Sequence, residues 1–202
     1  MGKRLPLMFH MSLLEIVGTL FGFANIVLLI RRSVWNFPAA MVMVSCIAVV
    51  LFEAKLYAEA GLQVFFFIVN VYGWWLWARA GGMQHAVQVG WMGWPTRIGW
   101  IAATAAVSLE LGWALSRYTD AAVPMVDSAV AGMSVSAQFL LSFRRIENWI
   151  AWIVIDVVSI WLYVSRDLDL LAVLYVAFLV LSVLGLREWW KAAKTGGEAG
   201  AA

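Results

Sequence analysis

Long apolar runs alternate with short polar breaks over nearly the whole chain. Crossing the hydrocarbon core of a bilayer takes about 20 mostly apolar residues in a helix. Runs of that kind predict seven spans, at about 12–30, 37–53, 60–79, 97–116, 124–142, 147–165 and 168–190. Pro38 falls in the first turn of the second run and Gly81-Gly82 follows the third, as expected at helix boundaries. The pattern predicts an all-α membrane protein with seven transmembrane helices.

The composition agrees with a membrane protein. Of the 202 residues, 64% are hydrophobic and 13% are charged, whereas a soluble domain has about 45–50% apolar and about 25% charged residues. The first run lacks a small-residue cleavage site, so it is interpreted as a permanent helix. The net charge of +2, with basic residues scattered over short loops, gives no reason to expect a nucleic-acid partner.

Lysine and arginine are unevenly divided between the two ends of the predicted bundle. Seven spans put the termini on opposite sides, and short cytoplasmic loops are enriched in Lys and Arg. The side of the C-terminus collects nine basic residues against five on the other side: Arg31, Arg32, Arg79, Arg97, Arg144, Arg145, Arg187, Lys191 and Lys194 against Lys3, Arg4, Lys55, Arg117 and Arg166. The count predicts a cytoplasmic C-terminus and an N-terminus outside.

Two parts of the chain resemble each other. Residues 25–38 (NIVLLIRRSVWNFP) align with 138–151 (QFLLSFRRIENWIA) at an offset of 113, which pairs Asn25 with Gln138. Two later matches have an offset of 112: Gly73 with Gly185 and Trp77 with Trp189. We therefore predict one transmembrane domain over 1–202, with repeat one at about 12–79, a linker helix at about 97–116 and repeat two at about 124–190. The single linker span makes the repeats parallel, a 3+1+3 arrangement.

The sixth run contains a carboxylate within a strongly apolar stretch. Asn148, Trp152 and Asp156 are spaced i, i+4 and i+8, and Trp149 lies close to the same helix face. A charged residue in a span costs about 2.5–3.5 kcal/mol on insertion scales, so it should face a protein interior or a cavity. Beside indole rings, such a carboxylate fits a site for a flat or cationic ligand. The alternatives are interfacial tryptophans and a structural hydrogen bond from Asp156 to a neighbouring helix.

The third run has a stripe of amides and rings. Gln63, Phe67, Asn70 and Trp74 lie at i, i+4, i+7 and i+11, which favours a site for a polar, planar solute over amides that only join helices. Gln138 could line the pore opposite Asn25. The sequence has no GxxxxGK[ST], HExxH, CxxC or GxSxG motif, so an enzyme is disfavoured and no cofactor is expected.

Three segments resemble the PnuC family of vitamin transporters: residues 56–77 (LYAEAGLQVFFFIVNVYGWWLW), residues 147–163 (ENWIAWIVIDVVSIWLY), and the Trp-x-x-Pro of residues 35–38. The resemblance implies a SWEET-like fold, a homotrimer in the bacterial cytoplasmic membrane, and facilitated diffusion of nicotinamide riboside. It also implies trapping by a cytoplasmic riboside kinase. The substrate contacts that it implies are Gln63, Asn70, Trp74, Trp149, Trp152 and Asp156.

Several alternatives stay open at this point. Close relatives carry thiamine or riboflavin, and a proton-coupled carrier could use Asp156 or Glu110 as its relay. A membrane assembly or receptor protein without transport is a third class. A phosphorylated substrate would need a basic residue in the pore, and none falls well inside a predicted span, which favours the nucleoside over the nucleotide.

Overall fold

The computed structural model describes residues 13–53, 55, 57–118, 123–166 and 169–199. Within these residues seven helices are long and apolar enough to cross a membrane. They are α1 (Leu13–Ile30), α2 (Asn36–Glu53), α3 (Tyr57–Trp77), α4 (Trp94–Tyr118), α5 (Pro124–Ser142), α6 (Glu147–Val164) and α7 (Asp169–Ala199), with a π-helical turn η1 (Ala78–Gly82) after α3. The chain is therefore a multi-pass, all-helical membrane protein, as predicted.

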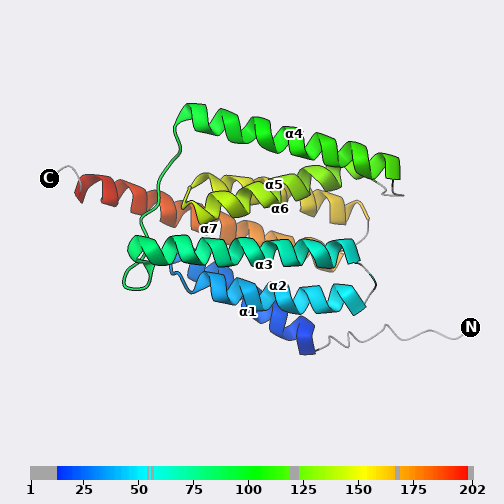
Figure 1. Cartoon of the computed structure of the whole chain (residues 1–202), viewed down its shortest axis with the longest axis horizontal. Helices are drawn as coiled ribbons and strands as arrows, with labels where there is room; N and C mark the ends of the chain where they lie inside the picture. Colours follow the sequence, from blue (N-terminus) through cyan, green and yellow to red (C-terminus); the bar gives the residue numbers. More distant parts are fainter. Residues whose placement is uncertain (1–12, 54, 56, 119–122, 167–168, 200–202) are drawn as a thin grey trace, which may run out of the picture.

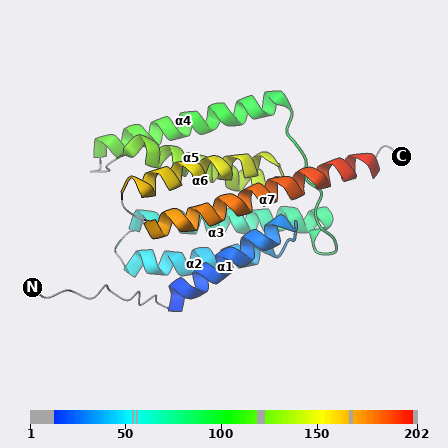
Figure 2. The ribbon, with the colours of Figure 1, turned by 180° about the vertical axis from the view of Figure 1, so that it is seen from behind.

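The helices form two groups of three with one helix beside them (Figure 1). In the first group α2 packs against α1 and α3, and in the second α6 packs against α5 and α7. The groups meet where α3 contacts α5 and where α1 contacts α7, whereas α4 packs against α5 alone. Both views show α1, α3, α5 and α7 running toward the end where α7 finishes, and α2, α4 and α6 running back (Figure 2). The parallel 3+1+3 arrangement is confirmed.

One end of the bundle carries most of the basic residues. We call it the arginine end, because the α1–α2 turn there holds Arg31 and Arg32 and the α5–α6 turn holds Arg144 and Arg145. The helix α7 continues beyond the predicted limit at 190 to Ala199, and an ion pair of 2.9 Å between Lys191 and Glu188 lies on this extension. Lys3 and Arg4, two of the five basic residues predicted for the other end, lie outside the described residues.

The two turns at the arginine end have the same backbone. Arg32 and Arg144 have left-handed φ values of 57° and 59°. Their carbonyls accept hydrogen bonds of 3.2 Å from two amides of the α3–α4 connection, those of Val87 and Gly90 respectively. The connection therefore fastens both turns in the same way.

This geometry corrects the register of the repeat. Arg32 corresponds to Arg144, so the offset is 112 here as it is for the later matches, and no insertion is needed. The alignment at 113 was wrong by one residue because it matched the side chains of the arginine doublets. In the structure Gln138 therefore corresponds to Ile26, not to Asn25. The predicted bounds of the repeats stay predictions.

A buried apolar cluster closes the bundle at the arginine end. Its members come from both halves and from the α3–α4 connection: Leu29, Val34, Phe37, Trp77, Val87, Leu141, Ile146, Trp149 and Trp189. The Trp77 indole N–H donates to the carbonyls of Leu141 and Ser142, both at 3.2 Å, and that of Trp189 donates to Leu29 O at 3.0 Å. The last carbonyls of a helix have no partner within it, so each half satisfies carbonyls at the end of the other half's first helix.

Glycines let two large rings approach these helices. A Cβ at Gly73 would overlap the Phe37 ring, and a Cβ at Gly185 would overlap the Trp149 ring. The two contacts are again related by the offset of 112. The close approach needs a residue without a side chain at both positions.

We predict that Gly185→Ala destabilises the protein by about 1–3 kcal/mol, the usual effect of overpacking a core. Gly61→Ala is the matched control, because nothing lies within 4 Å of a Cβ at Gly61 in α3. There the better helix propensity of alanine should leave stability unchanged or raise it by up to about 1 kcal/mol. Thermal unfolding of the purified proteins measures both. Equal melting temperatures would contradict the packing of Trp149 on α7.

Candidate functional site

A cavity of about 290 Å³ lies between the two halves, in the middle part of the bundle. Its lining comes from α1, α2, α3, α5, α6 and α7, and no described residue of α4 takes part. Six of the predicted site residues line it: Gln63, Asn70, Gln138, Trp149, Trp152 and Asp156. The stripes on α3 and α6 therefore face the same space.

Three predicted site residues lie elsewhere. Phe67 is 39% exposed and does not line the cavity, whereas Phe66 does. Trp74 packs against the buried cluster at the arginine end. Asn148 is fully buried, and its side-chain amide donates to Arg145 O at 2.6 Å within the α5–α6 turn. The cavity-facing stripe of α3 therefore follows i, i+3 and i+7, and Asn148 has a structural bond in place of a cavity position.

Amide side chains join the two halves at the cavity wall. The Gln138 amide of α5 donates to Asn70 Oδ1 of α3 at 3.1 Å, and the Asn70 amide donates to Phe66 O at 2.8 Å. Gln63 and Asn25 also line the cavity, and their side chains have no hydrogen-bond partner among the described residues. Two amides are therefore free to bond a polar solute, and two hold the wall.

Asp156 is the one acidic residue of the lining, and the lining contains no Lys, Arg or His. Its side chain is 3% exposed, and Ser182 Oγ donates to Oδ2 at 2.9 Å. In the described part of the chain Asp156 has no basic partner and no second hydrogen bond. The carboxylate thus ties α6 to α7 and keeps one oxygen free to accept a bond from a solute.

The two lining tryptophans have different surroundings. Trp149 is 2% exposed and meets Trp189 edge-on, with ring centroids 5.6 Å apart, while its Nε1 is buried without a partner among the described residues. Trp152 is only partly buried, and its ring contacts no other aromatic ring in the described chain. Trp149 belongs to the closed end of the cavity, and the face of Trp152 is free for a planar ligand.

The sequence analysis missed the contribution of α7. Tyr175, Phe178 and Ser182 line the cavity, and at an offset of 112 they correspond to Gln63, Phe66 and Asn70. Applying this offset to the stripe on α3 would have found them.

The lining of the second helix in each half breaks this correspondence. Ala40 and Val44 of α2 stand where α6 has Trp152 and Asp156, and all four residues line the cavity. One half therefore supplies a ring and a charge, while the other supplies space. A solute between the halves would meet different chemistry on its two sides.

Seven membrane-crossing helices in two parallel halves, with a closed polar cavity between them, define a membrane transporter. The chain belongs to the nicotinamide mononucleotide transporter family, whose model matches residues 12–191. This is the PnuC family of vitamin transporters, and the predicted membership is confirmed. The protein is a transporter and not an enzyme.

Individual relatives agree with this assignment. The chain is 25% identical to the nicotinamide riboside transporter PnuC of Escherichia coli, over 94% of this chain and 90% of that protein. It is 27% identical to the riboflavin/roseoflavin transporter RibM of Streptomyces davaonensis, over 90% and 86%. The crystal structure of the vitamin B3 transporter PnuC matches with a TM-score of 0.74 and 24% identity, over 90% of this chain and 82% of that chain.

We predict that Ser182→Ala lowers the free energy of unfolding by about 1–3 kcal/mol, because it leaves Asp156 buried without its partner. Ser134→Ala is the control, since Ser134 also lines the cavity but bonds only Val130 O of its own helix. Its removal should change stability by less than about 0.5 kcal/mol. Thermal unfolding of both variants is the measurement. Equal effects would show that the bond between α6 and α7 contributes little.

Proposed function

We propose that this protein carries nicotinamide riboside by facilitated diffusion. The observation that carries the proposal is the cavity lining, which combines a free indole face, one carboxylate and unpaired amides with no basic side chain. A cytoplasmic riboside kinase would trap the imported solute as its phosphate.

The chemistry of the solute fits the lining group by group. Nicotinamide riboside has a flat pyridinium cation with a carboxamide, and a ribose. Trp152 offers a ring for stacking and cation–π attraction, which reaches about 2 kcal/mol or more when desolvated. Asp156 balances the charge or accepts a ribose hydroxyl. Gln63 and Asn25 can exchange hydrogen bonds with the carboxamide or the sugar.

The nucleoside fits better than the nucleotide that the family description names. A phosphate group favours Arg or Lys partners, and the cavity has an acidic residue in their place. A volume of about 290 Å³ is small for a ligand site and suits a compact solute.

Thiamine and riboflavin are the alternative substrates. Thiamine is also a flat cation, so it shares the charge argument, and the similarity to RibM favours testing riboflavin. A proton-coupled carrier is the alternative mechanism. Glu110 is exposed on α4, away from the cavity, so Asp156 is the better candidate relay. Uptake into vesicles without a kinase separates the mechanisms, because a facilitator equilibrates its solute whether or not an uncoupler is present.

The proposed setting is the bacterial cytoplasmic membrane, with the arginine end in the cytoplasm and the N-terminus outside. The excess of basic residues at that end supports this orientation. Besides the lipid bilayer, the proposed partners are two further copies of the chain in a homotrimer.

We predict that calorimetry on the purified protein detects nicotinamide riboside in preference to thiamine and riboflavin. Trp152→Ala should weaken binding by about 1–3 kcal/mol, the range of base–aromatic stacking, and Asp156→Asn should weaken it while the protein stays folded. Trp161→Ala is the control, because Trp161 lies on the same helix and is 61% exposed.

Each outcome bears on a different part of the proposal. Binding of thiamine without binding of the riboside would overturn the substrate but keep the cavity. Unchanged affinity in Asp156→Asn, with a lowered melting temperature, would leave Asp156 a purely structural role.

The orientation predicts the side from which introduced cysteines react. In a Cys46→Ser background, Arg31→Cys should react with an impermeant reagent only from the cytoplasmic side, and Arg117→Cys only from outside. Both native side chains are exposed, at opposite ends of the bundle. Labelling of Arg31→Cys from outside in intact cells would reverse the topology.

A further inference from the structure

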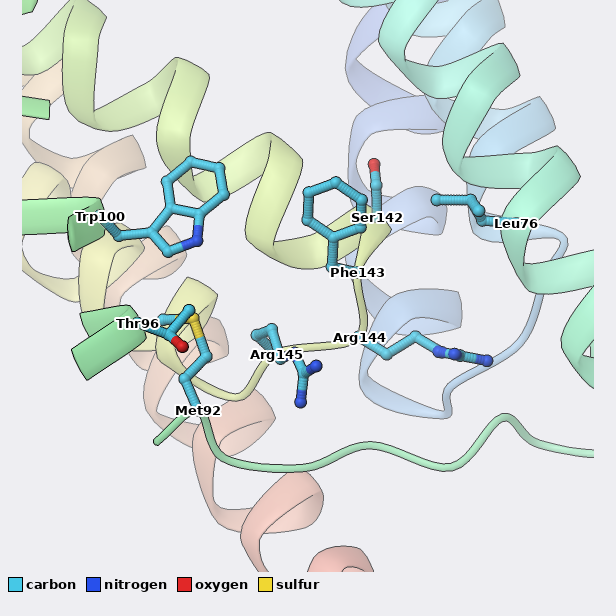
Figure 3. A pocket seen from close by; sticks show the side chains of 8 residues that line it. All are labelled: Leu76, Met92, Thr96, Trp100, Ser142, Phe143, Arg144 and Arg145. Carbon is cyan, nitrogen blue, oxygen red and sulfur yellow. The ribbon is translucent and has the colours of Figure 1, made fainter. Parts of the chain in front are cut away.

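A second pocket, of about 280 Å³, lies at the arginine end and away from the central cavity. It is formed by the start of α4, with Thr96 and Trp100, and by the α5–α6 turn, with Phe143, Arg144 and Arg145 (Figure 3). Figure 3 shows Arg145 on the side of Thr96 and Trp100, whereas Arg144 extends away from them. None of these residues lines the central cavity, so this pocket is a separate feature.

The pocket has a free positive charge. Arg145 is exposed and pairs with no carboxylate in the described part of the chain. The acidic residue nearest in sequence, Glu147, is already engaged, since its Oε1 accepts 2.8 Å hydrogen bonds from Arg97 Nε and from the Met92 amide. Arg145 therefore offers planar guanidinium donors to an anion from outside the chain.

Two further donors share the pocket with Arg145. The Thr96 hydroxyl and the Trp100 indole N–H have no hydrogen-bond partner among the described residues. Because Trp100 belongs to the first turns of α4, these donors lie near the end of the bundle, at the depth where a bilayer has its headgroups. Donors and guanidinium together suit a phosphate oxygen.

An aromatic surface continues from the pocket along α5. Trp100 of α4 contacts both Phe139 and Phe143, with centroids 6.5 and 6.4 Å apart, and Tyr72 of α3 meets Phe143 at 6.3 Å. The helices α3 and α4 do not pack against each other, so their side chains flank this surface without covering it. The rings thus extend from a cationic end toward the middle of the bundle, which is the polarity of a phospholipid.

We propose that this groove binds one anionic phospholipid. Arg145, Thr96 and Trp100 hold its phosphodiester, and an acyl chain lies along Phe143 and Phe139 between α3 and α4. This site joins α4, which otherwise contacts α5 alone, to the rest of the bundle. The inference does not depend on which solute the central cavity carries.

The test titrates the purified protein, in neutral detergent, with phosphatidylglycerol and follows bound lipid by native mass spectrometry. Arg145→Gln should lower the affinity about tenfold, equivalent to about 1.4 kcal/mol. The matched control is Arg31→Gln, which removes the same charge from the same end but is not in the pocket, and which should stay within about twofold because a distant charge is screened. Thr96→Val should weaken binding as well, without a change in charge.

Other arms separate the possible occupants. Phosphatidylglycerol with a photoreactive acyl chain should crosslink to the peptides of Phe143 or Trp100. Equal binding of phosphatidylcholine, or an equal loss in Arg31→Gln, would overturn the proposal. Displacement by millimolar inorganic phosphate would assign a free-anion site, and disulfide crosslinking of Phe143→Cys between two copies would assign a subunit interface. Should Arg145→Gln fail to fold, Thr96→Val and the crosslinked peptide decide.

Discussion

The reciprocal hydrogen bonds of Trp77 and Trp189 hold the two halves of this transporter together. Each indole crosses from the third helix of one half to carbonyls at the end of the first helix of the other. No water is present in a bilayer core to bond such groups, so unpaired carbonyls there are costly. Both tryptophans are fully buried. The bonds therefore fix how the halves oppose each other, and that register brings α3 and α6 to one cavity.

A nearly symmetric backbone thus encloses a one-sided site. Turns, glycine contacts and indole bonds repeat at one offset, yet Trp152 and Asp156 have Ala40 and Val44 as their counterparts. If both halves carried a tryptophan at this level, the second ring would occupy the volume that a solute needs. The asymmetry leaves space opposite one aromatic wall, and it gives a solute with a charged ring and a sugar a preferred direction in the cavity.

The sequence predicted the helices well because the bilayer restricts a span to a length and a polarity that a single chain reveals. It also indicated α6, since a carboxylate in an apolar run has few explanations. It did not indicate α7, because Tyr175 and Ser182 are ordinary residues in a membrane helix until the repeat register is known. Phe66 and Phe67 are adjacent and chemically alike, so only packing decides which of them faces the cavity.

The bond from Ser182 to Asp156 has a consequence for a carrier that works without an energy source. A site that binds too tightly releases its solute slowly, so conduction requires affinity that is sufficient for entry and weak enough for exit. A bare buried carboxylate would be unstable in the empty cavity and would hold a cation strongly. Donation by Ser182 stabilises the empty site, and it reduces the electron density that Asp156 can offer to the solute. Under facilitated diffusion, this bond moderates the attraction of the one charged group in the cavity.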